Sequence, residues 1–181
     1  MIEKEPITVI LSKRGWIRSM KGHVAAGEAD SLKFREGDAL ETMFHAQTTD
    51  KLLLVAEDGR AFTLGGDRLP GGRGFGEPVR LLVDLAAEVG IAALLPVKAD
   101  SRLLLASSDG KGFVARGEAV MAETRKGKQV MNLRPGARVA AVRPIGAEDD
   151  SVAVIGENRK LLVFPLAELP EMARGQGVTL Q

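Results

Sequence analysis

Three short stretches of the chain combine glycine with arginine or lysine, a pairing whose chemistry suits a phosphate group. They are Pro70–Gly76, Arg125–Lys128 and Ala173–Gly177. Glycine lets the backbone come close to a phosphate and direct its N–H groups toward it, and a neighbouring cation adds charge-assisted hydrogen bonds. A single stretch of this kind is typical of a solvated surface turn. Three of them, at comparable places in the chain, favour a surface that binds a polyanion.

The distribution of charge supports this interpretation better than the total does. The net charge is only +1, yet residues 101–143 carry +6, residues 1–58 carry −2, residues 59–100 are neutral and residues 144–181 carry −3. A basic region of this kind attracts a polyanion even when the whole chain is nearly neutral. Aromatic residues are only 4% of the chain, which argues against recognition of single strands by base stacking.

Other chemistry finds little support in these residues. The chain has no cysteine, which excludes disulfides and thiolate metal sites and fits a reducing cytoplasm. His23 and His45 lack ligand-like spacing, so we predict surface or packing roles and no metal site. The run Glu148–Asp150 is more typical of a solvated loop than of a Mg²⁺ site. No P-loop motif is present, and Lys126-Gly127-Lys128 does not replace one.

The elements that must position the glycine stretches are β-hairpins. Four segments share an apolar run, a polar turn and a second apolar run, namely residues 8–17, 52–62, 103–113 and 152–162. Their turn positions, Gly15, Gly59, Gly110 and Arg159, are 44, 51 and 49 residues apart. Asp58-Gly59 and Asp109-Gly110 are hairpin dipeptides, because aspartate tolerates positive φ and glycine adopts it readily. Both strands of each hairpin are largely apolar, so we expect both faces to be buried.

A hairpin every 45 to 50 residues predicts an all-β, propeller-like fold of about four blades. Their approximate ranges are 7–50, 51–100, 101–149 and 150–181. Each of the last three hairpins is followed by a glycine stretch, with Gly74, Gly127 and Gly175 lying 15, 17 and 16 residues after the turn. A further strand is expected after each stretch, at residues 78–83, 130–133 and 178–180. Helix is predicted to be minor, with single turns near 84–88 and 166–172. The alternative is chance recurrence of hairpins in a β-sandwich.

Several segments resemble the C-terminal domain of the A subunits of bacterial topoisomerase IV and gyrase. They are residues 7–18, Lys21-Gly22-His23, Phe34–Asp38, Arg73–Pro78 and Leu162–Pro170, and they follow the order of that family along the whole chain. The resemblance implies a β-pinwheel, a propeller-like disc in which neighbouring blades exchange strands, with a basic perimeter that bends duplex DNA. The gyrase heptapeptide Gln-Arg-Arg-Gly-Gly-Lys-Gly is absent, and residues 71–74 and 125–128 are only partial echoes of it. The sequence therefore resembles topoisomerase IV more than gyrase.

The same resemblance implies a longer parent protein. That parent would be the A subunit of an ATP-dependent heterotetramer of two A and two B subunits, which separates replicated chromosomes and relaxes supercoils. ATP and Mg²⁺ would be needed only by the whole enzyme, and no cofactor is expected for this chain. Because the chain lacks tyrosine, it cannot form the phosphotyrosyl link of that reaction, and we expect no catalytic residue. The expected location is the cytoplasm, at the nucleoid, with peripheral association with the inner membrane in the parent family. The domain itself is expected to be monomeric.

These arguments predict one set of DNA-contacting residues and leave other function classes open. The set is Lys13, Arg14, Arg18, Lys21, Arg68, Gly72, Arg73, Gly74, Arg80, Arg102, Lys111, Arg116, Arg125, Lys126, Gly127, Lys128, Arg174 and Gly175. A propeller-like platform for acidic proteins and a gyrase-type wrapping domain are the alternatives. A propeller hydrolase is disfavoured, because the acidic residues form no obvious catalytic pair. Binding that falls with salt and ignores DNA sequence would favour the DNA module.

Overall fold

The computed structural model describes residues 1–156 and 159–180 of the chain. Four β-hairpins account for eight of its strands, which are β1 (Pro6–Ser12) with β2 (Trp16–Lys21), β4 (Lys51–Ala56) with β5 (Arg60–Gly65), β8 (Arg102–Ser107) with β9 (Lys111–Arg116) and β12 (Ser151–Ile155) with β13 (Leu161–Pro165). Six further strands lie between or after them, namely β3 (Leu40–Gln47), β6 (Glu77–Pro78), β7 (Ile91–Val97), β10 (Lys128–Gln129), β11 (Val139–Ile145) and β14 (Val178–Thr179). The hairpins expected from the sequence are therefore confirmed.

The strands form four antiparallel sheets, which we call blades 1 to 4. Their strand orders are β3-β1-β2-β6, β7-β4-β5-β10, β11-β8-β9-β14 and β12-β13. The outer strands β6, β10 and β14 each follow one hairpin in the chain but pair with the hairpin before it. We call them exchange strands. Blades 1 to 3 thus each contain a strand from the next repeat, which confirms the all-β, propeller-like fold with exchanged strands.

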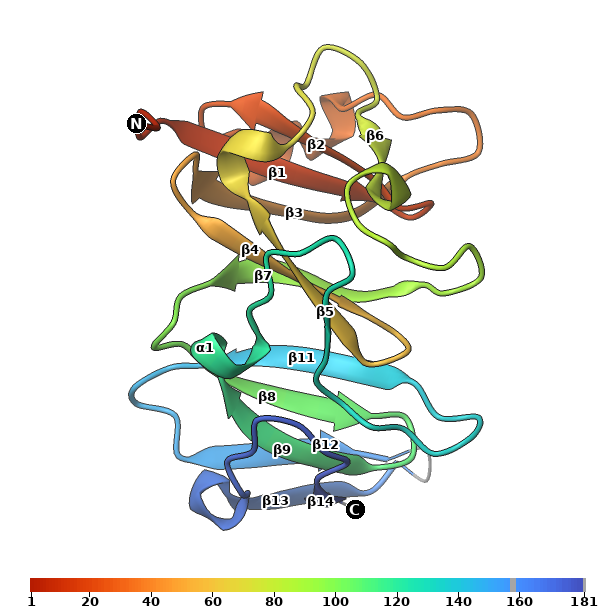
Figure 1. Ribbon diagram of the computed structural model, residues 1–181, viewed down its shortest axis with the longest axis vertical. Coiled ribbons are helices and arrows are strands. Elements are labelled where there is room, and N and C mark those ends of the chain that lie inside the picture. The colour runs from red at the N-terminus through yellow and green to blue at the C-terminus, as the bar shows by residue number, and fades with distance from the viewer. Residues whose placement is uncertain (157–158, 181) are drawn as a thin grey trace.

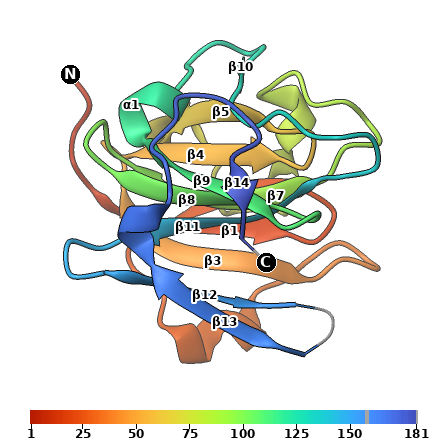
Figure 2. The ribbon, with the colours of Figure 1, turned by 90° about the horizontal axis from the view of Figure 1, so that it is seen from below.

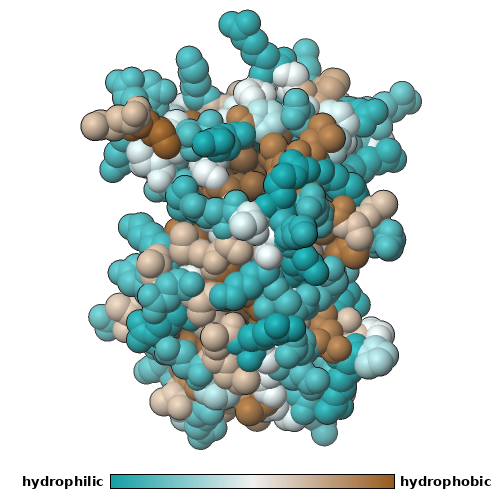
Figure 3. Space-filling view, in the orientation of Figure 1, coloured by the Kyte–Doolittle hydropathy of each residue, from teal (hydrophilic) through white to brown (hydrophobic). Residues whose placement is uncertain are grey.

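The blades succeed one another along the long axis of the molecule, from β1–β3 near one end to β12–β14 near the other (Figure 1). Seen along that axis, β10 and α1 (Gly117–Val120) lie on one side and the β12–β13 hairpin on the opposite side, with β4, β8 and β1 between them (Figure 2). Hydrophilic residues cover most of the face shown in Figure 3, and apolar residues reach the surface in patches among them.

The core fills the spaces between successive blades. In β4, Leu52 and Leu54 pack toward blade 1, whereas Leu53 and Val55 pack toward blade 3. Successive side chains of a strand point to opposite faces, so a strand enclosed on both sides is apolar at every position. The prediction of two buried faces is therefore confirmed for this hairpin.

Blade 4 departs from that prediction. In β13, Leu161, Leu162 and Val163 are 62%, 41% and 57% exposed. Among the described residues, no exchange strand pairs with β13 and no strand pairs with the other edge of β12. Only one face of this hairpin packs on the core, chiefly through Val152 beside Val114 of blade 3.

The hairpin turns differ in one respect from the expected geometry. The turn residues have positive φ, with values of 83°, 90°, 80° and 62° at Gly15, Gly59, Gly110 and Arg159. Asp58 and Asp109, in contrast, do not have positive φ. Arg159 is the one non-glycine residue with positive φ in the described chain. The Gly59 N–H donates to the Ala56 carbonyl at 3.0 Å, as in a type I turn followed by a left-handed bulge residue. Glu157 and Asn158, part of the fourth predicted turn, lie outside the described residues.

Helix is minor, as predicted, and the turn expected near 166–172 is confirmed by the 3₁₀ turn Leu166–Glu168. Short 3₁₀ helices occur at Ala26–Ser31, Gly66–Arg68, Val79–Leu81 and Leu166–Glu168, and α1 is one α-helical turn. No helix forms at 84–88, where a hydrogen-bonded turn is closed by Val89 N–H donating to Ala86 O at 3.1 Å. The strand expected at 78–83 is the 3₁₀ turn that follows β6. The strand expected at 130–133 is also wrong, because β10 ends at Gln129, whereas the strand expected at 178–180 is confirmed by β14. None of the helices in the described part of the chain is long and apolar enough to cross a membrane.

Candidate nucleic-acid interface

The three glycine stretches cross back to the preceding blade and lie over its outer edge. Each crossing begins at the same hydrogen bond, in which a backbone N–H in the second strand of the preceding hairpin donates to the crossing segment. These bonds are Ser19 N–H to Pro70 O at 2.8 Å, Thr63 N–H to Ala122 O at 2.9 Å and Val114 N–H to Pro170 O at 2.9 Å. The donors all lie four residues after a turn glycine. We call residues 71–76, 123–127 and 171–177 the exchange loops.

Each exchange loop ends at a second fixed point, a glycine with positive φ. Gly76, Gly127 and Gly177 have φ values of 82°, 66° and 79°. A Cβ atom at these positions would lie 2.1, 2.5 and 2.1 Å from the carbonyl oxygens of Ile17, Ala61 and Gly112. These carbonyls are equivalent, two residues after each turn glycine. The repeat therefore requires glycine here for close packing of two backbones as well as for conformation.

This geometry corrects the alignment of the glycine stretches. The equivalent residues are Gly76, Gly127 and Gly177, which lie 17, 17 and 18 residues after Gly59, Gly110 and Arg159. Gly74 and Gly175, aligned with Gly127 in the sequence, are two residues too early.

The four glycines predicted to approach a phosphate have different surroundings. Gly127 packs on Ala61, as above. A Cβ at Gly72 would lie 2.7 Å from Met20 Cγ, and one at Gly175 would clash with the methyl group of Met172. Packing in the fold therefore accounts for Gly127 and Gly72, whereas the contact at Gly175 is with the end of a flexible side chain that can move. Gly74 alone of the four has nothing within 4 Å of a Cβ position.

Several predicted DNA contacts are held by other parts of the protein. Arg125 donates to Leu81 O at 2.9 Å and lies 3.4 Å from the Asp84 carboxylate. Two other cations form ion pairs, Arg116 with Glu171 at 2.8 Å and Arg68 with Asp67 at 3.8 Å. Three more donate hydrogen bonds, Lys111 to Thr179 Oγ1 at 2.8 Å, Arg174 to Asn132 Oδ1 at 3.1 Å and Arg80 to Ala87 O at 2.5 Å. Most of these contacts fasten an exchange segment to a neighbouring part of the chain.

A second group of predicted residues is exposed and unpaired. Within residues 1–156 and 159–180, no side-chain hydrogen bond or ion pair holds Lys13, Lys21, Arg73, Arg102, Lys126 or Lys128. Arg14 is also exposed, and its backbone N–H donates to the Asp38 carboxylate at 3.0 Å. Arg73 and Lys126 lie within exchange loops, and Lys128 begins the exchange strand β10. These side chains are free to meet a phosphate.

Arg18 does not belong with this group, although its charge suggested a DNA contact. The residue is only 4% exposed. Its guanidinium donates to Gly74 O at 2.5 Å and to Lys33 O at 2.7 Å, and lies over the ring of Phe34. Burial lowers the pKa of Arg18 from its ordinary value. The side chain therefore faces the protein and is not presented to a duplex.

Two arginines near the exchange loops were missed at the sequence level. Arg60, directly after a turn glycine, donates to Lys126 O at 2.7 Å and so anchors the second exchange loop. Arg35 lies over the ring of Trp16, 4.4 Å from its centroid. The position of Arg60 beside the turn was a usable signal, whereas nothing in the sequence linked Arg35 to Trp16.

The two histidines form a stacked pair. The rings of His23 and His45 are 4.4 Å apart and nearly parallel. His23 Nε2 lies 3.1 Å from Ala46 O, and His45 Nε2 lies 2.6 Å from Val24 O. Each ring thus reaches the carbonyl that follows the other histidine, which joins the end of β2 to β3. Packing accounts for both histidines.

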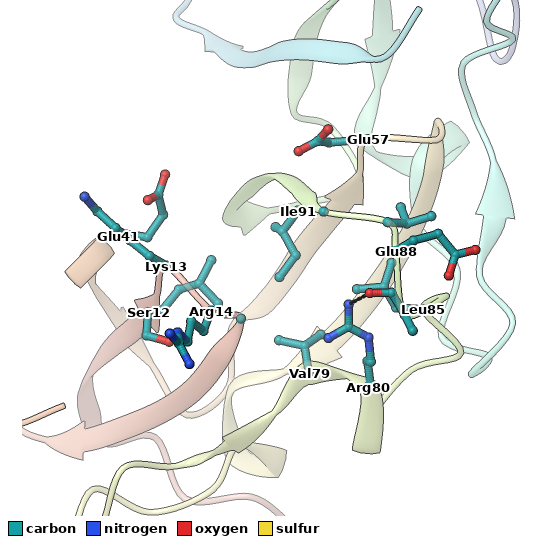
Figure 4. A pocket seen from close by; sticks show the side chains of 15 residues that line it. Ser12, Lys13, Arg14, Glu41, Glu57, Val79, Arg80, Leu85, Glu88 and Ile91 are labelled. Carbon is teal, nitrogen blue, oxygen red and sulfur yellow. Dashed lines mark hydrogen bonds between the residues drawn. The ribbon is translucent and has the colours of Figure 1, made fainter. Parts of the chain in front are cut away.

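A cavity of about 360 Å³ opens between the ends of blades 1 and 2 (Figure 4). Its charged lining combines the cations Lys13, Arg14 and Arg80 with the carboxylates Glu41, Glu57 and Glu88. Equal numbers of both signs do not suit a polyanion. The exchange loops, not this cavity, are therefore the candidate nucleic-acid interface.

Comparisons with known sequences and structures all point to the same family of proteins. The sequence profile described as "DNA gyrase C-terminal domain, beta-propeller" matches residues 101–145 and 150–181. The A subunit of DNA topoisomerase 4 from Rickettsia bellii is 52% identical over 99% of this chain, and that from Caulobacter vibrioides is 49% identical over all of it. The matches cover 24% and 23% of those proteins, so the chain spans about a quarter of their length.

Solved structures agree with the sequence relatives. The E. coli ParC C-terminal domain is 31% identical, with a TM-score of 0.88 over 97% of this chain and 71% of that chain. A C-terminal domain of DNA topoisomerase IV has a TM-score of 0.82 at 19% identity, covering 99% of this chain and 58% of that chain. At that identity the second match supports the fold alone.

Proposed function

The chain belongs to the family of C-terminal domains of topoisomerase IV and gyrase A subunits, and we propose that it binds duplex DNA without sequence preference and bends it across the exchange loops. The observation that carries this proposal is the recurrence of one backbone arrangement on three successive blades. Each exchange loop is fixed at both ends on the preceding blade and has at least one exposed cation, the unpaired Arg73 in the first, the unpaired Lys126 in the second and, in the third, Arg174, which is bound to Asn132.

Such an arrangement suits a duplex for two physical reasons. Cations meeting phosphates release condensed counterions, which supplies sequence-independent affinity. Bending a site of 20–30 base pairs costs about 1–6 kcal/mol, which further protein contacts must offset. Loops held at both ends offer such contacts at fixed positions, and no long helix of the described chain could enter the major groove to read bases.

We further propose that the parent protein is the A subunit of an ATP-dependent type IIA topoisomerase, closer to topoisomerase IV than to gyrase. In an assembly of two A and two B subunits in the cytoplasm, this domain would steer DNA for decatenation and relaxation. ATP and Mg²⁺ would serve the other parts of that enzyme. The covalent step would also lie there, because the chain has no tyrosine. The domain alone would be a monomer.

The test is a fluorescence-anisotropy titration with random-sequence duplexes of about 40 base pairs at several salt concentrations. The test variant is Lys126→Glu/Lys128→Glu, which leaves the tethered Arg125 in place. Its control, Lys4→Glu/Lys98→Glu, makes the same change in net charge at two exposed lysines outside the exchange loops. We expect the test variant to weaken binding and to make the slope of log affinity against log salt shallower by about 2, at about 0.9 per lost contact.

The outcomes separate the function classes. Affinity that falls steeply with salt, is equal for unrelated sequences and drops only in the test variant supports the proposal. Equal losses in both variants would show that net charge matters and the loop position does not, which would contradict the proposed interface. No binding of the wild-type protein at low salt would overturn DNA binding by this domain and favour the alternative of a platform for acidic proteins.

A further inference from the structure

Blade 1 carries a buried arginine where the next two blades carry a buried phenylalanine. Arg18 is the third residue after Gly15, and the equivalent residues in blades 2 and 3 are Phe62 and Phe113, both fully buried. Among the described residues, Arg18 is the one charged side chain that is buried. An apolar residue satisfies the fold at this position, so the arginine needs another explanation.

The charge of Arg18 is not neutralised by a carboxylate. Its hydrogen-bond acceptors are two backbone carbonyls, Gly74 O and Lys33 O. No ion pair in the described chain includes it. A buried charge is ordinarily paired, because removing it from water is costly. Here the positive charge lies beneath the first exchange loop, through its hydrogen bond to Gly74 O, and has no carboxylate beside it.

The same loop contains two glycines that the fold does not require. A Cβ at Gly71 or Gly74 would have nothing within 4 Å, and neither residue has positive φ. In contrast, Gly72 and Gly76 of this loop pack on Met20 and Ile17. The two unconstrained glycines are exposed and flank Gly72 and Arg73. Their outer side is bare backbone, as needed when a ligand approaches the main chain closely.

We propose that the first exchange loop, residues 71–76, is a phosphate-binding site for the DNA backbone, and that Arg18 is its positioning residue. Bare backbone at Gly71 and Gly74 lets a phosphodiester come close, and Arg73 meets it directly. Arg18 holds the Gly74 carbonyl from below and adds unneutralised positive charge. This inference rests on the proposed DNA binding and assigns blade 1 a contact that differs from those of blades 2 and 3.

The first test replaces an unconstrained glycine. Gly74→Ala adds a methyl group on the open side of the loop, and Gly27→Ala is its matched control, because Gly27 also has open space and no positive φ. Both variants should fold with unchanged or slightly raised stability. In the same anisotropy assay, Gly74→Ala should lose threefold or more in affinity, and Gly27→Ala should match the wild type.

The second test is a double-mutant cycle on DNA affinity. The DNA affinity of the Arg18→Met/Arg73→Ala double mutant should differ by about threefold or more from the value expected if the two single effects were additive, because the effects of residues in one network are not additive. Arg18→Met and Lys126→Ala, on different blades, should be additive within about twofold. If Arg18→Met does not fold, Arg18→Phe replaces it, since phenylalanine occupies this position in blades 2 and 3. Equal coupling in both cycles would indicate a general structural role and overturn the inference.

The results also distinguish this inference from the proposed function. Wild-type binding that depends on salt, together with full affinity in Gly74→Ala and Arg73→Ala, would overturn the phosphate site and leave DNA binding by the domain intact. Absence of wild-type binding at low salt would overturn both.

Discussion

The turn glycines allow conformation and packing to be separated in one pair of variants. Gly15 and Gly59 are equivalent turn residues, with φ values of 83° and 90°. A Cβ at Gly15 would lie 3.7 Å from Ile91 Cδ1, an ordinary contact, whereas a Cβ at Gly59 would lie 2.1 Å from Met131 O. Alanine therefore meets similar backbone strain at both positions but a steric clash only at Gly59.

The expected magnitudes follow from these two terms. A left-handed conformation costs an L-residue about 1–2 kcal/mol, partly offset by the lower entropy of the unfolded chain with alanine. Gly15→Ala should therefore lose about 1 kcal/mol. Relief of the clash at Gly59 requires the Met131 carbonyl to move, and overpacking of this kind adds about 1–3 kcal/mol. Gly59→Ala should lose about 2–4 kcal/mol, which lowers Tm by roughly 2–4 °C for each kcal/mol in a chain of this size.

The assay is urea unfolding followed by far-UV circular dichroism, with DNA affinity measured on the folded proteins. Because Gly59 O accepts the Val130 and Met131 N–H groups at 2.9 and 3.2 Å, Gly59→Ala should also displace β10 and weaken DNA binding through Lys128. Gly15→Ala should leave that binding unchanged. Equal losses of stability within about 0.5 kcal/mol would refute the argument that the exchanged segment packs tightly on the turn.

Two further changes test the surroundings of the loops. Burial alone raises the pKa of Asp38, but hydrogen bonds from Ser12 and from two backbone N–H groups hold it below its ordinary value. A lowered pKa stabilises the fold above about pH 4, the unfolded value, and this contribution is lost as the pH falls through the folded pKa. Asp38→Asn should therefore lose less stability on acidification than the wild type, as measured by urea unfolding at pH 6 and pH 3, and an identical loss would contradict this assignment. Arg60→Met should weaken DNA binding at unchanged salt conditions, because it releases the Lys126 carbonyl, and unchanged affinity would show that this anchor is dispensable.

The sequence predicted the hairpins because their signal is local. In β4, five consecutive apolar residues precede a turn with glycine, and the structure confirms that both faces are buried. The exchange strands carry no comparable signal. β6 is two residues long and pairs with Trp16 and Ile17, about sixty residues earlier in the chain. No periodicity exists over two residues, so neither the bounds of β6 nor its alignment with β10 and β14 could be predicted.

The candidate interface was predicted only in part, for a related reason. Cations are exposed in most proteins, so every arginine and lysine of the basic stretches was a reasonable DNA contact. The structure separates the free side chains, such as Lys126, from tethered ones, such as Arg125, through acceptors that are distant in sequence. Arg18 shows this most clearly. Its acceptors, Gly74 O and Lys33 O, are 56 and 15 residues away, and hydrogen bonds to backbone carbonyls leave no trace in residue type.

Strand exchange also connects the stability of the fold to the proposed function. Each exchange loop belongs by sequence to one repeat and by packing to the one before it, so its position depends on two blades. A change at Gly59 in blade 2 therefore moves a cation that the third repeat supplies, through the contact with Met131. Such coupling would serve the DNA bending proposed above. Bending costs energy that phosphate contacts must offset. Because each exchange loop is held by two blades, the spacing between the cations of successive loops would be maintained under the strain of a bent duplex.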